Sequence, residues 1–336
     1  MKTIVVFGAT GNIGRYYTKY LCEHLNLNEY SIIAAGTKMT DIFNGYPVKY
    51  ISVNIVNKAD FERLPKSTYA VVDFAGMMPA RMEGYDPQRY IDVNITGTLN
   101  ILEYCRKSGA DRMLFTQSFG DIKDNSEKDV LLRSDSPKNF GFDNDHTIYV
   151  MSKNFAVDMM KNYHEMYGLK NFVFRLPTIY SYSPIDHYYV DGIKRWIGYR
   201  YLINQAIAGN DIEVWGDPNR PKDMIYVKDL CQMMYKALFA SVGGGCYNAG
   251  TGVGTSLIDQ IEGMIKVFCP KDKKSNIIMR PDKPNAPQYI MDISNAKEDL
   301  GYEPEYNYIA MLEDMKKEME TDNSNNHHKR PALAQQ

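Results

Sequence analysis

The stretch that decides the fold is residues 4–14, which read IVVFGATGNIG. An apolar run typical of a strand leads directly into Gly8, Gly11 and Gly14, and an amphipathic segment follows. In such a unit the first glycine allows a tight turn, the second lets the backbone approach a pyrophosphate, and the third permits close helix packing. The helix start adds unpaired N–H groups and a positive dipole end. The stretch therefore predicts a dinucleotide site that includes Thr10, Asn12 and Ile13; a tight turn without a ligand is the alternative.

The residues around this stretch predict an α/β protein. Short β-branched runs alternate with amphipathic segments over residues 3–175, the pattern of β-α-β units that stack into a parallel sheet. The runs are apolar enough for helices to cover both faces. We expect a Rossmann-type doubly wound parallel sheet with strands at 4–7, 32–35, 48–51, 71–75, 113–116 and 172–175, and helices clearest at 90–107 and 150–167.

A smaller, mostly C-terminal lobe is expected beyond this sheet. From residue 181 a Tyr- and Pro-rich stretch leads to a helix-like segment at 196–208 and a turn-rich segment at 216–221. Candidate strands at 224–227 and 246–248, around a helical 228–239, return the chain to the sheet. We therefore expect a dinucleotide-binding domain at 1–180, rejoined by about 223–250, and a substrate-binding lobe at 181–222 and 251–320. A disordered tail is expected at 321–336.

Composition excludes several classes of protein. The 336 residues carry 39 Lys and Arg against 41 Asp and Glu and are 44% hydrophobic, which excludes disorder as the main state. The near balance of charge disfavours nucleic-acid binding. No apolar run approaches the roughly 20 residues that span a bilayer, so we expect a cytoplasmic protein without a membrane partner. The five cysteines lack a CxxC pair and the histidines lack ligand spacing, so neither a disulfide framework nor a metal is expected.

The segments after the second and third strands leave the choice of cofactor open. The second strand ends in Ala34-Ala35-Gly36-Thr37-Lys38, where an acidic residue would contact the ribose 2′-OH of NAD. Thr37 and Lys38 could hold a 2′-phosphate instead, which favours NADP slightly over NAD; a solvated turn lysine is the alternative. A further strand ends in Asn54-Ile55, where an aspartate more commonly contacts the adenine.

A tyrosine and a lysine carry the expected chemistry. Of 26 tyrosines, only Tyr149 has a lysine four residues later, Lys153, and this spacing places both on one helix face. An adjacent ammonium and the positive nicotinamide ring could lower the pKa of the tyrosine enough to make it a base. An exposed Tyr and Lys on a helix surface is the alternative. Upstream, the apolar residues 113–115 lead to Thr116 and Ser118, hydroxyls at the strand end where ligands bind in such sheets.

Together these residues resemble the extended short-chain dehydrogenase/reductase family, the NAD-dependent epimerase/dehydratase group that acts mostly on nucleotide sugars. The resemblance covers residues 3–318. Its motifs occur in the family's order: GATGNIG at 8–14, Asp73-Phe74-Ala75-Gly76, Asn94 within VNITGTLNILEYC, Ser118, Tyr149-Val150-Met151-Ser152-Lys153, Arg175-Leu176-Pro177, DMIYVKD at 223–229, Tyr247-Asn248-Ala249-Gly250 and Leu300-Gly301-Tyr302-Glu303-Pro304.

The resemblance implies roles for particular residues. Ser118, Tyr149 and Lys153 would be catalytic, with Ser118 bonded to the substrate oxygen and Lys153 to the nicotinamide ribose. Further cofactor contacts are implied at Phe74, Ala75, Gly76, Asn94 and Leu176. Glu213 and Trp215 would border the base of a sugar nucleotide, and Lys222 and Arg280 its pyrophosphate. Trp215 as ordinary core and Arg280 as a solvated charge are the alternatives.

Departures from the family's pattern narrow the reaction. Dehydratases carry an Asp-Glu pair directly after the catalytic hydroxyl, and the related decarboxylases carry a glutamate just past it, but Ser118 is followed by Phe119-Gly120. Epimerisation or a simple oxidation or reduction remains. The segment 119–148 is longer than usual, a lysine stands at 222 where an arginine is expected, and Thr178 replaces an asparagine that contacts the sugar nucleotide in UDP-galactose 4-epimerase. These departures suggest an unusual substrate.

The leading hypothesis is therefore a nucleotide-sugar epimerase with tightly held NAD(P). Tyr149 would deprotonate the C4 hydroxyl, hydride would pass to the nicotinamide, and the ketone would turn and be reduced on its other face. The alternatives are an NADPH-dependent reductase of a keto-sugar nucleotide or related carbonyl, and a non-catalytic dinucleotide-sensing protein. By the same resemblance we expect a homodimer that forms through the helices at 90–107 and 150–167.

Overall fold

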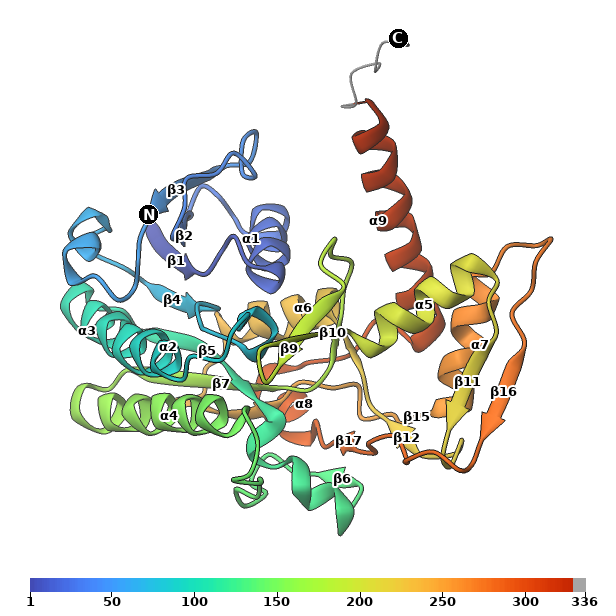
Figure 1. The fold of residues 1–336 in the computed structure, drawn as a ribbon. Coiled ribbons are helices and arrows are strands. Elements are labelled where there is room, and N and C mark those ends of the chain that lie inside the picture. Colours follow the sequence, from blue (N-terminus) through green and yellow to red (C-terminus); the bar gives the residue numbers. More distant parts are fainter. Residues whose placement is uncertain (329–336) are drawn as a thin grey trace.

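The centre of the molecule is a seven-stranded sheet (Figure 1). The computed structural model describes residues 1–328. The strands lie in the order β14-β7-β5-β4-β1-β2-β3, and every neighbouring pair is parallel. Their bounds are β1 (Lys2–Phe7), β2 (Tyr30–Gly36), β3 (Val48–Ser52), β4 (Ala70–Asp73), β5 (Arg112–Ser118), β7 (Lys170–Leu176) and β14 (Gly244–Asn248). This confirms the predicted doubly wound α/β fold.

Alternate residues of the strands build two separate cores. Ile4 and Val6 of β1 join the core beneath α1 (Asn12–His24) and α6 (Val227–Ala237), whereas Val5 and Phe7 join the core beneath α3 (Thr98–Ser108) and α4 (Thr147–Tyr167). A strand alternates its side chains between faces, so continuous apolar runs such as IVVF are what a sheet covered on both sides requires.

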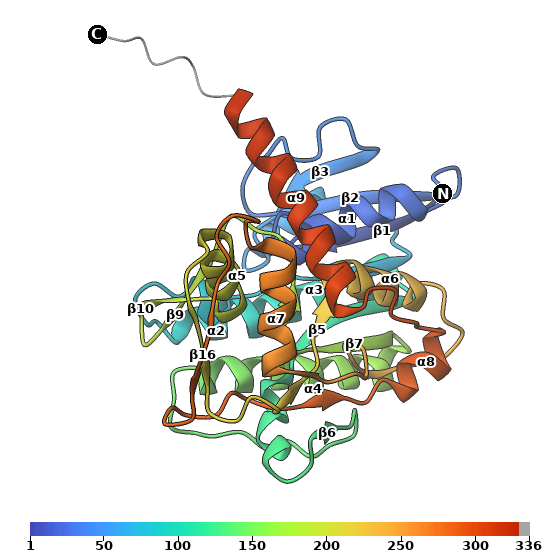
Figure 2. The ribbon, with the colours of Figure 1, turned by 90° about the vertical axis from the view of Figure 1, so that its right-hand side faces the viewer.

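A second lobe packs at one end of the sheet. Its helices α7 and α9 lie in front of the sheet in the view of Figure 2. It contains α5 (Gly198–Ala208), β11 (Ile212–Trp215), α7 (Leu257–Phe268), β16 (Ile277–Arg280) and α9 (Tyr308–His328), and β11 pairs in parallel with β16. Ile203, Val214 and Leu312 belong to the same core as Ile4, so the lobe has no separate hydrophobic core.

The remaining elements are short and lie mostly in the connections. They are the 3-10 turns η1 (Lys58–Arg63), η2 (Pro79–Arg81), η4 (Phe119–Asp121) and η5 (Lys123–Glu127), the helices α2 (Gln88–Tyr90) and α8 (Ser294–Leu300), the π-helical turn η3 (Ile91–Gly97), and the strands β6 (Leu131–Leu132), β8 (Ile179–Tyr180), β9 (His187–Val190), β10 (Ile193–Trp196), β12 (Pro221–Lys222), β13 (Ile225–Tyr226), β15 (Thr255–Ser256) and β17 (Ile290–Met291).

Three segments differ from the sequence expectations. Trp196, expected at the start of a helix, ends β10, because the turn at Asp191-Gly192 folds residues 187–196 into a hairpin. Residues 224–227, expected in the large sheet, contribute only β13, which pairs with β8 outside it. Residues 321–328, expected in the disordered tail, continue α9; the rest of that tail, 329–336, lies outside the described residues.

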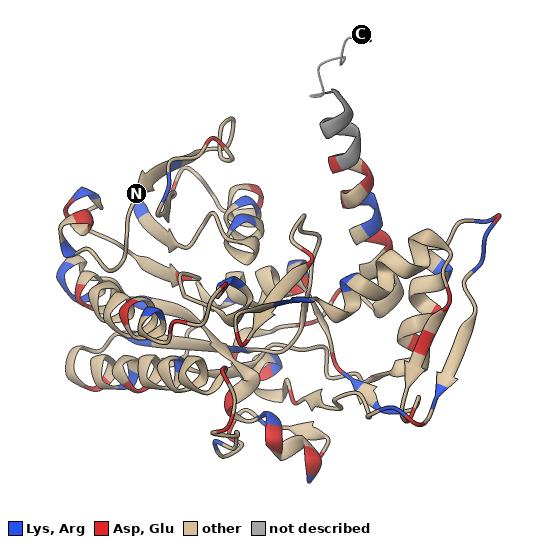
Figure 3. Ribbon diagram, in the orientation of Figure 1, with Lys and Arg blue, Asp and Glu red and all other residues tan. Residues whose placement is uncertain are grey.

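Charged residues of both signs are interspersed over the two lobes (Figure 3). Within residues 1–328, none of the helices combines the length and apolar character that a membrane crossing needs.

Candidate active site

The predicted cofactor and catalytic residues follow the carboxyl ends of the parallel strands. β1 lies between β2 and β4, so the chain winds in opposite directions from this point of the sheet. In open α/β sheets ligands bind in the crevice outside the strand ends at such a switch point. Gly8 follows β1, Phe74 follows β4 and Ser118 ends β5, which places all three at this edge.

The glycine loop leaves no room for side chains at Gly8 and Gly14. Gly8 has φ +69°, and a Cβ there would lie 2.6 Å from Ala75 N. A Cβ on Gly14 would lie 2.2 Å from Gly8 O, so helix α1 packs directly on the turn. α1 begins after Gly11 with neither a side-chain cap nor an acidic residue in its described first turn. This cradle fits the pyrophosphate of a dinucleotide.

The side chain of Asn12 ties the cofactor loop to the second lobe. Its Nδ2 donates to Ser181 Oγ at 2.6 Å. One turn later, Tyr16 Oη donates to Tyr182 O at 3.2 Å. The stretch at which the second lobe begins is therefore anchored on the first turns of α1.

The residues predicted near the adenosine half occupy different environments. Thr37 and Lys38 are exposed just after β2, where Ser52 Oγ donates to Thr37 O at 3.2 Å. Asn54 is exposed, and its Oδ1 accepts from Val56 N at 3.2 Å. Ile55 is buried. Its side chain packs closely on Gly97, where a Cβ would lie only 2.5 Å from Ile55 Cδ1. Adenine contacts by Asn54 and Ile55 stay a prediction.

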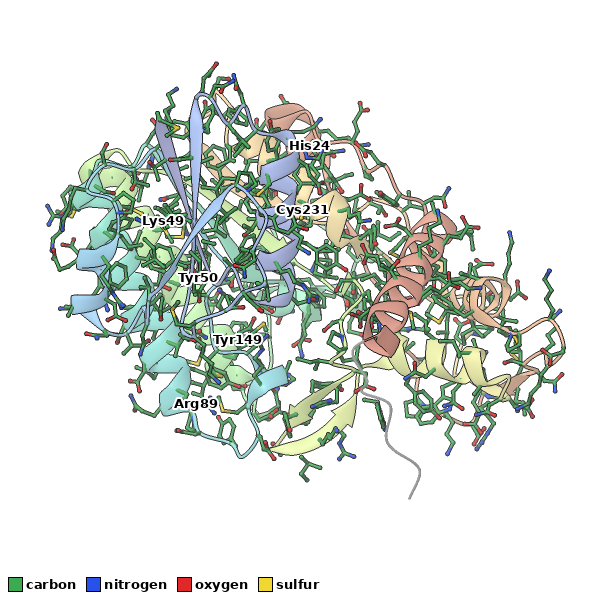
Figure 4. The ribbon with its side chains drawn as sticks, turned by 90° about the horizontal axis from the view of Figure 1, so that it is seen from above. His24, Lys49, Tyr50, Arg89, Tyr149 and Cys231 are labelled. Carbon is green, nitrogen blue, oxygen red and sulfur yellow. The ribbon has the colours of Figure 1, made fainter. Side chains whose placement is uncertain are left out.

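The structure brings Ser118, Tyr149 and Lys153 together. Tyr149, labelled in Figure 4, lies in the first turn of α4, and Lys153 follows one turn later. Ser118 Oγ accepts from Gly120 N at 3.1 Å and hydrogen-bonds Tyr149. Burial raises the pKa of Tyr149 to about 12, and among the described groups only this bond to Ser118 opposes it. The expectation that Lys153 lowers this pKa finds no support before a cofactor binds.

Lys153 and Asp73 are both buried, and each influences the pKa of the other. Lys153 is 6% exposed, and its Nζ lies 3.8 Å from the centre of the Phe115 ring. Asp73 is fully buried beside Phe115 in the β4–β5 register, and its Oδ2 has no hydrogen-bond partner among the described residues. Burial lowers the pKa of Lys153 and raises that of Asp73, and the opposite charge of each opposes the shift of the other.

Asp73 is a residue to which the sequence analysis assigned no role. Asp73 was noted only as the first residue of the motif Asp73-Phe74-Ala75-Gly76. The signal was available, because a carboxylate ends the otherwise apolar strand Ala70–Asp73 and is buried with it.

Asn94 positions the loop after β4 and the first turn of α4. It lies in the π-helical turn η3, a geometry that is common at functional sites. Its Oδ1 accepts from Met77 N at 2.8 Å, and its Nδ2 donates to Met77 O and to Ser152 Oγ at 3.0 and 2.9 Å. Ser152 Oγ in turn donates to Tyr149 O at 2.7 Å. The Asn94 side chain is thus engaged with protein groups and supports the backbone at Tyr149 through Ser152.

Tyr289 connects two of the predicted substrate residues to the catalytic strand. Its hydroxyl lies 3.2 Å from Thr178 Oγ1, its ring centre lies 4.8 Å from that of Phe119, and Lys222 Nζ lies 5.9 Å from its ring. Leu176 pairs with Ser118 in the β5–β7 register, two residues before Thr178. The sequence analysis missed Tyr289, whose neighbours all come from distant parts of the chain.

Lys222 has the environment of an anion-binding group. Burial lowers the pKa of its ammonium to about 8. It forms no ion pair with any residue that the structure describes. A desolvated cation without a counter-charge favours an anionic ligand.

Glu213, Trp215 and Arg280 form one cluster on the β11–β16 pair. Arg280 Nη1 lies 2.6 Å from Glu213 Oε1, its Nε and Nη2 bond both oxygens of Asp282, and Trp215 Nε1 donates to Glu213 Oε2 at 2.8 Å. Trp215 is 47% exposed, so its reading as ordinary core is wrong. Arg280 is already neutralised by two carboxylates, so a phosphate contact there would compete with them. The substrate roles of the cluster stay a prediction.

A cavity of about 210 Å³ opens beside the catalytic residues. It is lined by Pro79, Ser118, Phe119, Gly120, Lys123, Phe140, Gly141, Asn144, His146, Thr147, Tyr149 and Val150. In the described part of the chain, no group of three or more His, Cys, Asp and Glu side chains has the arrangement of a metal site. The site therefore offers a phosphate cradle, a Ser-Tyr-Lys group and a cavity for the reacting part of a substrate.

Comparisons with known proteins agree with this fold. The chain is 24% identical to a UDP-glucuronate 4-epimerase of Thermodesulfobacterium geofontis, over 94% of this chain and 95% of that protein. Two solved structures share the fold at 20% identity: a UDP-glucose 4-epimerase of Thermotoga maritima with UDP-glucose (TM-score 0.77; 96% of this chain, 99% of that one) and a UDP-glucuronic acid 4-epimerase of Bacillus cereus with NAD (TM-score 0.73; 94% and 99%).

The sequence also matches the NAD dependent epimerase/dehydratase family over residues 4–250, which include the glycine loop, Ser118, Tyr149 and Lys153. The protein is thus an NAD-dependent enzyme of the extended short-chain dehydrogenase/reductase type, and the chain belongs to the NAD-dependent epimerase/dehydratase family.

Proposed function

We propose that the protein interconverts nucleotide sugars that differ in configuration at C4. The observation that carries this proposal is a Ser118–Tyr149–Lys153 group in which no carboxylate directly follows Ser118. The nearest carboxylate after Ser118 is Asp121, which is buried and bound by Arg175 through Nε and Nη2, each at 3.0 Å. No carboxylate lines the cavity beside Tyr149. An elimination of water needs such an acid and base, so 4-epimerisation is favoured over dehydration.

We propose NAD as the resident cofactor rather than NADP. The loop at Gly8, Gly11 and Gly14 and the start of α1 would hold its pyrophosphate, and Lys153 its nicotinamide ribose. When bound, NAD supplies the acceptor and donor of hydride. The family's dependence on NAD and the NAD in the Bacillus cereus structure support this choice over the slight preference for NADP that Thr37 and Lys38 suggested.

Within this scheme the protein's own groups move one proton. Ser118 hydrogen-bonds the substrate oxygen while Tyr149 takes the hydroxyl proton, and Tyr149 returns that proton when the other face of the sugar is reduced. The raised pKa of Tyr149 in the protein alone means that it starts protonated. The nearby positive charge of a bound oxidised cofactor would favour its ionised form. Proton removal is thereby coupled to cofactor occupancy.

We further propose a UDP-sugar as substrate. Several of the relatives act on or bind UDP-sugars. Thr178, Lys222 and the cluster of Glu213, Trp215 and Arg280 would receive the nucleotide. Lys222 is the strongest of these, because its ammonium is desolvated and has no acidic partner among the described residues.

The decisive experiment follows the C4 configuration directly. Purified protein with NAD is incubated with UDP-glucose and with UDP-glucuronate, and the products are resolved by proton NMR. We expect conversion to the C4 epimers and a loss of at least about 100-fold in kcat for Tyr149→Phe, which lacks the acid–base hydroxyl. Tyr167→Phe, an exposed tyrosine on the same helix, serves as the matched control and keeps the wild-type rate. Failure to epimerise any UDP-, GDP-, dTDP- or CDP-sugar would contradict the proposal.

Reduction of a keto-sugar nucleotide by NADPH is the second candidate. The observation that favours it is Lys38, which is exposed after β2 without an acidic residue beside it on that strand. An epimerase returns its cofactor unchanged, whereas a reductase oxidises NADPH in proportion to product. Mass spectrometry of the dinucleotide released by denaturation, together with the absorbance of reduced nicotinamide during turnover, separates the two.

We also propose that the protein forms a homodimer through α3 and α4. Apolar side chains are exposed along these helices: Leu99, Met151, Phe155, Met166 and Tyr167. A row of exposed apolar groups on adjacent helices is typical of a protein interface.

A further inference from the structure

Much of the wall of the cavity beside Tyr149 comes from the segment 119–148. This segment carries β6 and projects below the sheet in Figure 1. It supplies Lys123, Phe140, Asn144 and His146 to the cavity wall. Apart from Tyr149, the ionisable side chains that line the cavity are Lys123 and His146, and no aspartate or glutamate lines it.

Neither of these two basic groups has an acidic hydrogen-bond partner. Lys123 is half-buried and forms no ion pair with a described residue. His146 Nε2 is buried without a hydrogen-bond partner in the described structure. Its nearest carboxylate oxygen, Asp145 Oδ1, lies 3.7 Å away, which is beyond hydrogen-bond range. The other Asp145 oxygen accepts from Asp191 N at 2.6 Å.

The first turn of α4 adds a third positive influence. His146 is its N-cap residue and makes no capping hydrogen bond, and the first turn contains no acidic residue. Thr147, Tyr149 and Val150 of this turn line the cavity. The positive end of a 21-residue helix therefore borders the same space as the two basic side chains.

We propose that this cavity binds a carboxylate on the sugar, so that the substrate is a nucleotide-linked uronic acid. This inference rests on the proposed 4-epimerisation. In a hexuronate the carboxylate is attached to C5, the carbon next to C4, so it lies close to the hydroxyl that Tyr149 serves. Lys123, a donor from His146 Nε2 and the start of α4 converge on that position. A neutral hydroxymethyl group would leave the half-buried Lys123 ammonium without a counter-charge in the cavity, which disfavours it.

The test compares two substrates that share the same nucleotide and pyrophosphate. The 4-epimerisation of UDP-glucuronate and UDP-glucose is measured with the full-length protein, and the affinity for each is measured calorimetrically with the Tyr149→Phe variant. Because the pyrophosphate is common to both, any difference reports the group at C6. We expect UDP-glucuronate to be preferred in kcat/KM and in affinity by at least about 10-fold, the effect of one charge-assisted hydrogen bond.

Variants then assign the preference to the cavity. Lys123→Gln and His146→Ala are expected to reduce the preference for UDP-glucuronate by about 10-fold or more, mainly through KM. Lys128→Gln removes an exposed charge from the same segment outside the cavity and is expected to keep the wild-type preference. Equal kinetics and affinities for the two sugars, or equal losses for both in Lys123→Gln, would overturn the carboxylate subsite.

The two proposals fail in different ways. If both sugars are epimerised with equal efficiency, the proposed function stands and the subsite falls. If neither is epimerised but Tyr149→Phe still binds UDP-glucuronate more tightly through Lys123, the subsite stands and the reaction falls. If neither sugar nucleotide binds, both proposals fall.

Discussion

At the residue scale, Asp73 is the group most directly linked to the protonation of the site. Its negative charge opposes the loss of the Lys153 proton that burial favours. We expect Asp73→Asn to lower the pKa of Lys153 further, so that activity falls about 10-fold at neutral pH and its alkaline decline moves to lower pH. The pH profile of kcat/KM measures this. Asp158→Asn, on the exposed face of α4, should leave the profile in place. If Asp73→Asn lowers the rate but leaves the pH profile of kcat/KM unchanged, Asp73 has only a structural role.

At the element scale, α9 is attached to the sheet domain through Lys228 of α6. Lys228 Nζ bonds Asp314 and lies 3.1 Å from Glu318 Oε1, while Tyr226 Oη donates to Asp314 at 2.7 Å.

Lys228→Met leaves two carboxylates together, so we expect the free energy of unfolding to fall by about 1–3 kcal/mol. The pKa of Asp314 is lowered, so this stabilisation is present above the ordinary carboxyl pKa and is lost as pH falls through the folded value. In urea unfolding, the difference in the free energy of unfolding between Lys228→Met and the wild type should therefore become smaller at acidic pH. Lys266→Met, which removes an exposed charge from α7, is the control. A difference that stays constant at acidic pH would contradict the ion-pair account.

At the scale of the whole molecule, the exposed apolar residues of α3 and α4 lead us to expect a homodimer that forms through these helices. Phe155 is 51% exposed on α4. If two copies meet there, Phe155→Glu places a charge in an apolar interface and should yield a monomer in light scattering coupled to gel filtration. Phe142→Glu, which is more exposed but lies in the segment 119–148, should remain dimeric. A monomeric wild-type protein would exclude this interface.

The features that could be predicted from the sequence depend on residues close together in the chain. Gly8, Gly11 and Gly14 follow one strand directly, and the spacing of Tyr149 and Lys153 is a property of one helix. The pairing of Trp215 with Arg280 depends instead on the register of β11 with β16, which lie far apart in the sequence. No local pattern encodes such a register, so Glu213 could not be foreseen as a partner of Arg280.

The contacts of Asp73 and Tyr289 were hidden for the same reason. Asp73 meets Lys153 through the sheet neighbour Phe115, and Tyr289 meets Thr178 across the lobe boundary. Burial, which shifts the pKa values of Asp73, Tyr149 and Lys153, also depends on tertiary packing. The sequence could predict Tyr149 and Lys153 as reacting groups, but the shifts of their pKa values depend on the fold.

The position of β14 at the edge of the sheet bears on the order in which the chain folds during synthesis. This strand pairs with β7, yet it is translated only after residues 181–222 of the second lobe. A nascent chain that ends before residue 244 leaves the β7 edge open, and one that ends before residue 227 also lacks α6. An open edge invites aggregation. The large sheet is thus completed only after part of the second lobe has emerged from the ribosome, and a fragment cut at residue 180 should not fold by itself.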